Sequence, residues 1–179
     1  MRTYKQQNIT TLDYSHQDII ELPKLPESLK ILYCGDNKLI ELPKLSDSLK
    51  YLNCSNNNIK ELPNLPDSLE RLDCDYNNIT ELPKLPKSLE TLICDDNNLK
   101  ELPPLPDSVR LLFCSNNKLT ELPELPDSLT MLDCKRNKLP FNNLDGYKIW
   151  YQENEKIIKE KGLSKTYKLY NKSSKYNIL

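Results

Sequence analysis

The sequence predicts a mainly β solenoid of about seven turns, and three observations carry this prediction. Six cysteines, six asparagines and six Leu-Pro pairs each recur at intervals of 20 residues. A fixed period of this length is the signature of a stacked repeat protein, in which every turn contacts only its neighbours. An apolar fraction of 37% in 179 residues permits one modest core.

The frame of the repeat consists of columns of residues that lie 20 positions apart. In each unit, apolar residues lead to a cysteine, an asparagine follows three positions later, and Leu-Pro steps and a serine complete the unit. The columns run from Cys34 to Cys134, Asn37 to Asn137, Leu39 to Leu139, Leu22 to Leu122, Leu25 to Leu125 and Ser28 to Ser128. A degenerate first turn is predicted at the N-terminus, where the frame positions are filled by Ile9, Leu12, Tyr14, Gln17 and Ile19.

Each unit predicts one short strand and a non-helical return. The segment L-x-x-L-x-C ends in alternating apolar and polar residues, which suits a strand with one buried face. Pro23, Pro26 and their repeats remove backbone donors and favour extended or polyproline-like geometry. We therefore expect a parallel concave sheet, roughly 29 Å across for seven strands at about 4.8 Å spacing, and a polyproline-like convex side.

The unit L-x-x-L-x-C-x-x-N-x-L-x-x-L-P-x-L-P-x-S resembles the leucine-rich repeat over about residues 9 to 141. Its short form with two Leu-Pro steps is similar to repeats of secreted bacterial effectors and of giant-virus proteins. The resemblance implies the fold far more specifically than the function. The departures are cysteine where many relatives have Leu or Val, Val109 in a leucine column, and Ser46 where neighbouring repeats have proline.

The cysteine column falls on the inward face of the strand, where a small, polarisable core filler is expected. A zinc site would need ligands that converge tetrahedrally, whereas these thiols stack in a line. Disulfides between adjacent turns are an alternative, since Cα atoms about 4.8 Å apart lie inside the permitted range. The Cβ separation would exceed that of a relaxed bridge, so we expect free, buried thiols.

The asparagine column is expected to bond the backbone of the tight turn that leaves each strand, and so to form a ladder of buried amides. The serine column is expected to cap the turn that precedes each strand. Neither column is expected to be catalytic.

Side chains that point outward between the inward leucines and cysteines vary while the frame repeats, so they mark the candidate surface. They predict an acidic centre with aromatic residues on one side and apolar residues on the other, a mixture typical of a protein-binding face. The candidate partner-binding residues are Tyr33, Tyr51, Arg71, Asp73, Asp75, Tyr76, Ile93, Asp95, Asp96, Leu111, Phe113 and Met131. A solvated face with scattered apolar residues is the alternative.

A catalytic interpretation stands beside this one. Asp75 and Asp95 fall on neighbouring turns, so their carboxylates could approach the roughly 5 Å separation of a retaining glycosidase pair. An open sheet does not exclude water, however, and the sequence supplies no lid. We expect no enzyme and no cofactor, with a glycan-acting enzyme or a weak calcium site on the aspartates as alternatives.

After Phe141 the repeat stops, and an amphipathic helix is predicted from about Gly146 to Lys161. Asn143 or Asp145 can cap its start, and Gly162 marks its end. The aromatic stripe of this helix is expected to cover the last turn, with a partner-binding or membrane-surface helix as the alternative.

These predictions divide the chain into an N-terminal cap with a degenerate repeat (1–21), a solenoid (22–141), a C-terminal capping helix (142–162) and a basic Lys/Tyr tail (163–179). Eight lysines and three glutamates give residues 148–179 a charge of +5, which leaves −6 on residues 1–147. An acidic body is a poor general nucleic-acid binder, so nucleic-acid contact through the tail is the lesser alternative to a flexible tail or an added cap strand.

The N-terminal residues lack the apolar region of a signal peptide, and no stretch approaches the roughly 18 apolar residues of a membrane span. We expect a monomeric cytoplasmic protein, in the host cytoplasm if it is viral or an effector, with no membrane partner. The predicted function is a non-catalytic interaction module that holds an unidentified protein on its concave face.

Overall fold

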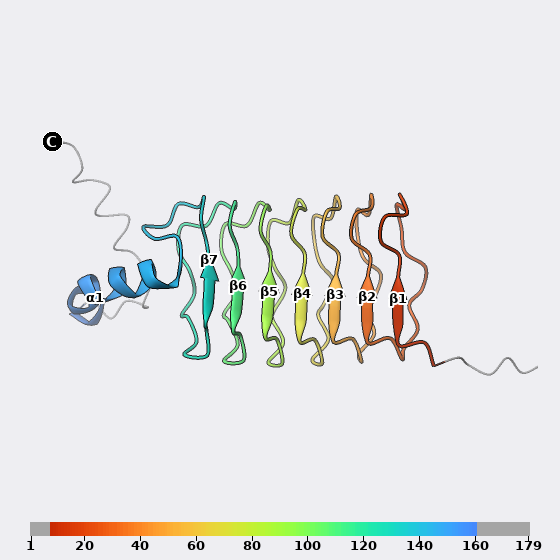
Figure 1. Cartoon of the computed structure of the whole chain (residues 1–179), viewed down its shortest axis with the longest axis horizontal. Coiled ribbons are helices and arrows are strands. Elements are labelled where there is room, and N and C mark those ends of the chain that lie inside the picture. Colours follow the sequence, from red (N-terminus) through yellow and green to blue (C-terminus); the bar gives the residue numbers. More distant parts are fainter. Residues whose placement is uncertain (1–7, 161–179) are drawn as a thin grey trace, which may run out of the picture.

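The computed structural model describes residues 8–160 and confirms a solenoid with one parallel sheet (Figure 1). Each turn, here called a rung, contributes one strand, and the strands stack in sequence order. The strands are β1 (Thr11–Asp13), β2 (Ile31–Tyr33), β3 (Tyr51–Asn53), β4 (Arg71–Asp73), β5 (Thr91–Ile93), β6 (Leu111–Phe113) and β7 (Met131–Asp133). Every residue of β1 to β6 pairs with the residue 20 positions further along the chain.

The core lies between the sheet and the returning arcs. The middle leucines of β2 to β6 are fully buried, whereas the residues before and after them are half-buried on the outer face. The arcs of the solenoid rungs contain no helix between residues 14 and 143, as the prolines predicted. Their leucines close the core from behind, and Leu45 and Leu85 are each 4% exposed.

The asparagine column forms the predicted ladder. The amide of Asn77 donates to the carbonyls of Cys54, Cys74 and Asp75, at 3.0, 3.3 and 3.0 Å. Its oxygen accepts the backbone N–H of Ile59 in the preceding rung, at 3.0 Å. Each buried asparagine therefore ties together two rungs.

The serine column differs from its predicted role. Ser68 donates its hydroxyl hydrogen bond to backbone carbonyls of the preceding rung, those of Asp47 at 2.9 Å and Leu49 at 2.7 Å. Ser88 and Ser108 repeat this arrangement. The prediction that these serines cap their own turn is wrong, because the carbonyls within reach of the hydroxyl belong to the neighbouring rung.

A left-handed residue follows two positions after each cysteine, and the sequence analysis did not anticipate it. These residues are Asp36, Asn56, Tyr76, Asp96, Asn116 and Arg136, with φ between 48° and 55°. The left-handed conformation lets the chain turn sharply at the end of each strand. Asp and Asn adopt it more readily than other side chains, so Tyr76 and Arg136 carry more strain than their counterparts.

Helix α1 (Leu144–Glu160) lies beside β7 at the end of the solenoid opposite β1 (Figure 1). Asn143 caps it, since its side-chain oxygen accepts the N–H of Gly146 at 2.8 Å. The cap lies three residues before Gly146, the predicted start, and the helix accordingly begins two residues earlier than predicted, at Leu144. The predicted end at Lys161 and Gly162, and the basic tail, lie outside the described residues.

An aromatic cluster joins α1 to the last rung. Phe141 and Tyr147 are 5% and 8% exposed, and their ring centroids lie 5.3 Å apart. The Trp150 ring lies 5.5 Å from that of Phe141. This contact covers the core at the C-terminal end, as the aromatic stripe predicted. Within residues 8–160 no helix is long and apolar enough to cross a bilayer.

Replacing Asn77 by alanine is expected to destabilise the solenoid, because the Ile59 N–H and three carbonyls would lose their partner in a buried site. Each buried group left unsatisfied costs about 1 to 3 kcal/mol. The exposed neighbour Asn78 is the matched control, and Asn78→Ala is expected to change stability by less than about 0.5 kcal/mol. Urea denaturation followed by circular dichroism measures both; equal midpoints for the two variants would contradict the ladder's role.

Candidate functional site

The predicted candidate residues that lie on strands all point to the outer, concave face of the sheet. Two outward positions flank the buried leucine of every strand, and the in-register pairing lines each of them up across the sheet. One column contains Tyr51, Arg71, Leu111 and Met131, and the other contains Tyr33, Asp73, Ile93 and Phe113. The structure places them in the predicted order: aromatic, acidic, apolar.

The aromatic side of the face is a stack that ends in a cation. The rings of Tyr33 and Tyr51 lie 5.1 Å apart and are tilted by 50°. The guanidinium of Arg71 lies over the Tyr51 ring, 5.5 Å from its centroid, where the negative face of the ring attracts it. Arg71 therefore joins the tyrosines to the acidic centre.

The acidic centre is built around Asp73 and Asp75, whose carboxyl groups lie within hydrogen-bonding reach of each other. One carboxylate oxygen of Asp73 forms an ion pair with Arg71 at 3.9 Å and accepts a long hydrogen bond from the Asn53 amide at 3.5 Å. Its other oxygen is buried and has no donor among the described residues. Burial and the negative charge of Asp73 both raise the pKa of Asp75, because two adjacent carboxylates cannot both ionise readily.

Burial raises the pKa of Asp75 to about 7, and the negative charges of Asp73, Asp95 and Asp96 add to the shift. Burial likewise raises the pKa of Asp95 to about 6, although the backbone N–H of Ser115 opposes the shift. Burial also raises the pKa of Asp73, against the effect of Arg71. Asp75 is therefore the carboxyl of this centre whose pKa lies nearest neutral pH.

The apolar side of the face begins directly beside the acidic centre, because Asp73 of β4 pairs with Ile93 of β5. Ile93 pairs with Phe113, and Leu111 pairs with Met131, so the four apolar side chains form one block across β5 to β7. Met131 is 49% exposed, and the other three are half-buried. The four side chains are contiguous, unlike the scattered apolar residues expected of a solvated face.

Tyr76 and Asp96 lie beyond the strands, in the left-handed turns at the rim of the face. Tyr76 is 58% exposed. With Asp75 and with Asp36, Ser55 and Asn56, it lines a shallow hollow of about 440 Å³. The rim position follows from the turn that the sequence analysis did not anticipate.

Sequence reasoning missed two residues that contact the candidate side chains, Asn53 and Ser115. Asn53 contacts Asp73, as described above. Ser115 donates its backbone N–H to Asp95 and its hydroxyl to Asp133 at 2.8 Å, which extends the polar network along the rim. Both occupy outward columns of the repeat, so the periodicity places them on this face, but their neutral side chains did not single them out.

The six thiols lie behind the sheet and take no part in this face. All six cysteines are buried and free. Burial raises the pKa of Cys34 and Cys134 to about 12 and that of the four inner thiols well above the ordinary value. Cys34 points its thiol at the carbonyl of Asn53, at 3.2 Å. Such thiols are poor nucleophiles and metal ligands.

The chemistry open to the face is limited by its shape. A carboxyl that keeps its proton near neutral pH, as Asp75 does, can act as a general acid. Among residues 8–160, however, nothing closes over the sheet to exclude water. The part of the chain that the structure describes also contains no group of three metal-ligating side chains placed to hold an ion.

The comparisons agree with this geometry. A family described as leucine-rich repeats (2 copies) matches residues 47–87. The fold is similar to that of YopM from Yersinia enterocolitica, with 45% identity over 66% of this chain and a TM-score of 0.66. A Shigella effector LRR domain shares 34% identity over 73% of this chain, with a TM-score of 0.68. The chain is a leucine-rich repeat protein.

This leucine-rich repeat protein is also similar to YopM of Yersinia pestis, described as a leucine-rich effector protein. The identity is 34% over 71% of the present chain, and the TM-score is 0.64. The chain spans 26%, 60% and 43% of these three solved structures. The sequence has no match among the curated proteins. Leucine-rich repeat proteins, including effector domains, are typically protein-interaction modules.

The stability of the protein is expected to fall as the pH rises from about 4 to about 7. The pKa of Asp75 is about 7 in the folded protein, against 3.8 for an ordinary aspartate. The folded state therefore binds the proton more tightly, so the stabilisation is complete below about pH 4 and is lost as the pH rises through about 7. Asp75→Asn is expected to reduce this pH dependence by about 1 to 2 kcal/mol, a figure discounted for the half-exposed carboxyl.

Urea denaturation at a series of pH values tests this expectation. Asp107→Asn, which removes an exposed carboxyl on a convex arc, is the matched control and is expected to follow the wild type. If Asp75→Asn retained the wild-type pH dependence, Asp75 would not be the protonated group.

The thiols are expected to resist modification in the native protein. Because burial raises their pKa values, Ellman's reagent should react rapidly with none of the six in native protein and with all six after denaturation in guanidinium. Rapid reaction of even one native thiol would show that the column is not part of a closed core.

Proposed function

We propose that this leucine-rich repeat protein is a non-catalytic interaction module that binds a protein partner on its concave face. The observation that carries the proposal is the adjacency of three kinds of side chain on one rigid sheet. The tyrosine–arginine stack, the acidic centre and the apolar block follow one another from β2 to β7. An interface that combines aromatic and arginine anchors with apolar area has the composition of a protein-binding surface.

The sheet also suits this role mechanically. The outward side chains stand on strands that are fixed by the buried leucines and the asparagine ladder. Their positions are therefore set before a partner arrives, which limits the ordering entropy that binding must overcome. The partner contacts in this proposal are Tyr33, Tyr51, Arg71, Asp73, Asp75, Tyr76, Ile93, Asp95, Asp96, Leu111, Phe113 and Met131.

Tyr76 gives the proposal independent support. Its backbone is left-handed, a conformation that costs most side chains about 1 to 2 kcal/mol. Four of the six rungs place Asp or Asn at this position, whereas Tyr76 exposes a large aromatic ring beside the acidic centre. Local strain of this kind concentrates at functional sites.

The solved structures that resemble this chain include proteins described as bacterial effectors. On that basis the proposal extends to a partner in the cytoplasm of a host cell.

The proposal is tested by affinity purification from cytosolic lysate with mass spectrometry. The wild type is compared with a Tyr51→Ala, Asp73→Lys, Phe113→Ala variant, which alters one residue in each part of the face. A protein captured by the wild type and lost by the folded variant is the expected result. Identical sets of captured proteins would show that the concave face does not bind them.

Tyr76→Asn is expected to stabilise the fold by about 1 kcal/mol, because Asn adopts the left-handed conformation more readily. The same substitution is expected to weaken partner capture, which separates binding from folding. Arg136→Asn relieves the same backbone conformation in the last rung, outside the proposed face, and serves as the matched control. Thermal unfolding and the capture assay measure both effects; stronger capture by Tyr76→Asn would contradict a role for the ring.

A further inference from the structure

The two ends of the solenoid differ in how the core is covered. At the C-terminal end, α1 and its aromatic cluster pack against the last rung. At the other end, within residues 8–160, no rung precedes β1. Leu12 and Tyr14 of the first rung are only half-buried, whereas their counterparts Leu32 and Cys34 are fully buried.

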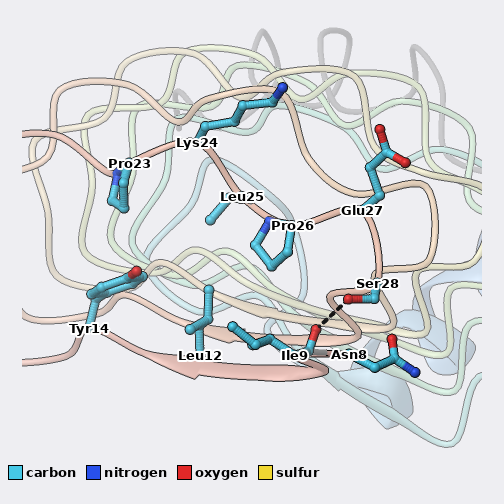
Figure 2. A pocket seen from close by; sticks show the side chains of 10 residues that line it. All are labelled: Asn8, Ile9, Leu12, Tyr14, Pro23, Lys24, Leu25, Pro26, Glu27 and Ser28. Atoms are coloured by element: carbon cyan, nitrogen blue, oxygen red, sulfur yellow. Dashed lines mark hydrogen bonds between the residues drawn. The ribbon is translucent and has the colours of Figure 1, made fainter. Parts of the chain in front are cut away.

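This uncovered end, here called the N-terminal end surface, is hollow. Figure 2 shows Leu12, Tyr14, Leu25 and Pro26 pointing into the space that the first rung encloses. The hollow has a volume of about 830 Å³. Ser28 closes one side of the rung by donating to the carbonyl of Ile9, at 2.8 Å.

One edge of β1 faces away from β2. At the same edge of each later strand, backbone N–H and carbonyl groups form hydrogen bonds with the preceding rung. In β2, the N–H of Ile31 donates to the carbonyl of Thr10 at 2.9 Å, and the carbonyl of Tyr33 accepts the N–H of Tyr14 at 2.8 Å. These two groups mark the side of each strand that faces its predecessor.

The 20-residue register identifies the matching groups on β1 as the N–H of Thr11 and the carbonyl of Asp13. Both face away from β2. The side chain of Gln17 reaches the Asp13 carbonyl only at 3.4 Å. An exposed edge of this kind is a template for an added strand.

The N-terminal end surface continues an interface that the molecule already forms six times, once between each pair of successive strands. An occupant must therefore supply what a preceding rung supplies: an acceptor for the Thr11 N–H, a donor for the Asp13 carbonyl, and apolar side chains over the half-buried Leu12 and Tyr14. An extended segment with apolar residues at alternate positions, running parallel to β1, meets all four conditions.

Two features of the chain favour a partner protein as the source of that segment. In the 20-residue register, Arg2 and Lys5 stand where Leu22 and Leu25 stand in the next repeat, so residues 1–7 lack the leucines of a rung. At the opposite end, α1 occupies the surface that a second copy would need for head-to-tail stacking.

We propose that the N-terminal end surface docks an extended apolar segment of a partner protein, which joins the sheet as a strand parallel to β1. This docking surface is separate from the concave face and does not depend on it.

The probe is a synthetic peptide that copies residues 48–55 with valine in place of Cys54, which keeps apolar residues at the alternate positions 52 and 54; this segment already serves as a preceding rung for β4. The control peptide has serine at both leucine positions. The full chain, labelled with ¹⁵N, is titrated with each peptide at millimolar concentration. The probe is expected to shift the amide resonances of Thr11 and Asp13 and to slow Thr11 exchange roughly tenfold, and the control to do neither.

A pair of variants identifies the backbone contact. Thr11→Pro removes the N–H that would bond the added strand, and it is tolerated at a strand edge. It is expected to weaken binding of the probe roughly tenfold, whereas Thr11→Ala, which keeps the N–H, retains binding.

Several results would overturn the proposal. One is a probe peptide that leaves the amide resonances of Thr11 and Asp13 unchanged. Another is a control peptide that binds as tightly as the probe. Slow exchange of Thr11 and Asp13 in the free monomer would show that the chain covers its own edge. A dimer in sedimentation that Thr11→Pro disrupts would make a second copy the occupant. None of these results bears on the proposed concave-face contacts, because both variants keep all twelve of those residues and change only Thr11, at the edge of the sheet.

Discussion

The buried amide of the asparagine column is the interaction on which the rest of the solenoid depends, because each one serves backbone groups of two rungs at once. Asn57, Asn77, Asn97 and Asn117 are 7% to 9% exposed, and each amide donates to the carbonyl of the preceding rung's cysteine as well as to that of its own. A tight turn at the end of every strand would otherwise leave these groups buried without partners. With the turns fixed, the strands stack in strict register, and everything presented on the concave face inherits that register.

The period of 20 residues was enough to predict the fold, since it places each leucine and cysteine on one face of a strand and each variable residue on the other. The left-handed turn and the direction of the serine hydroxyls could not be predicted in this way. Both depend on which backbone groups come within reach after stacking, as Ser68 shows by bonding the preceding rung. Periodicity reports which residues share a face, but not which hydrogen bonds they form.

In the candidate site too, the sequence predicted which residues share a face but not the interactions that they form. The sequence predicted the order of aromatic, acidic and apolar side chains, because order along the sheet follows from order along the chain. It did not predict the raised pKa values of Asp73 and Asp75, or the links through Asn53 and Ser115. Those properties arise from burial and from approach distances between rungs, which a linear pattern does not contain.

The in-register stacking makes the concave face divisible into equal steps. Because each rung contacts only its neighbours, a whole repeat inserted between β4 and β5 would leave the frame intact. It would increase the distance between Asp73 and the apolar block by one strand spacing, about 4.8 Å. Recombination between repeats can therefore change the distance between the acidic centre and the apolar block in steps of one strand spacing, while the fold stays unchanged.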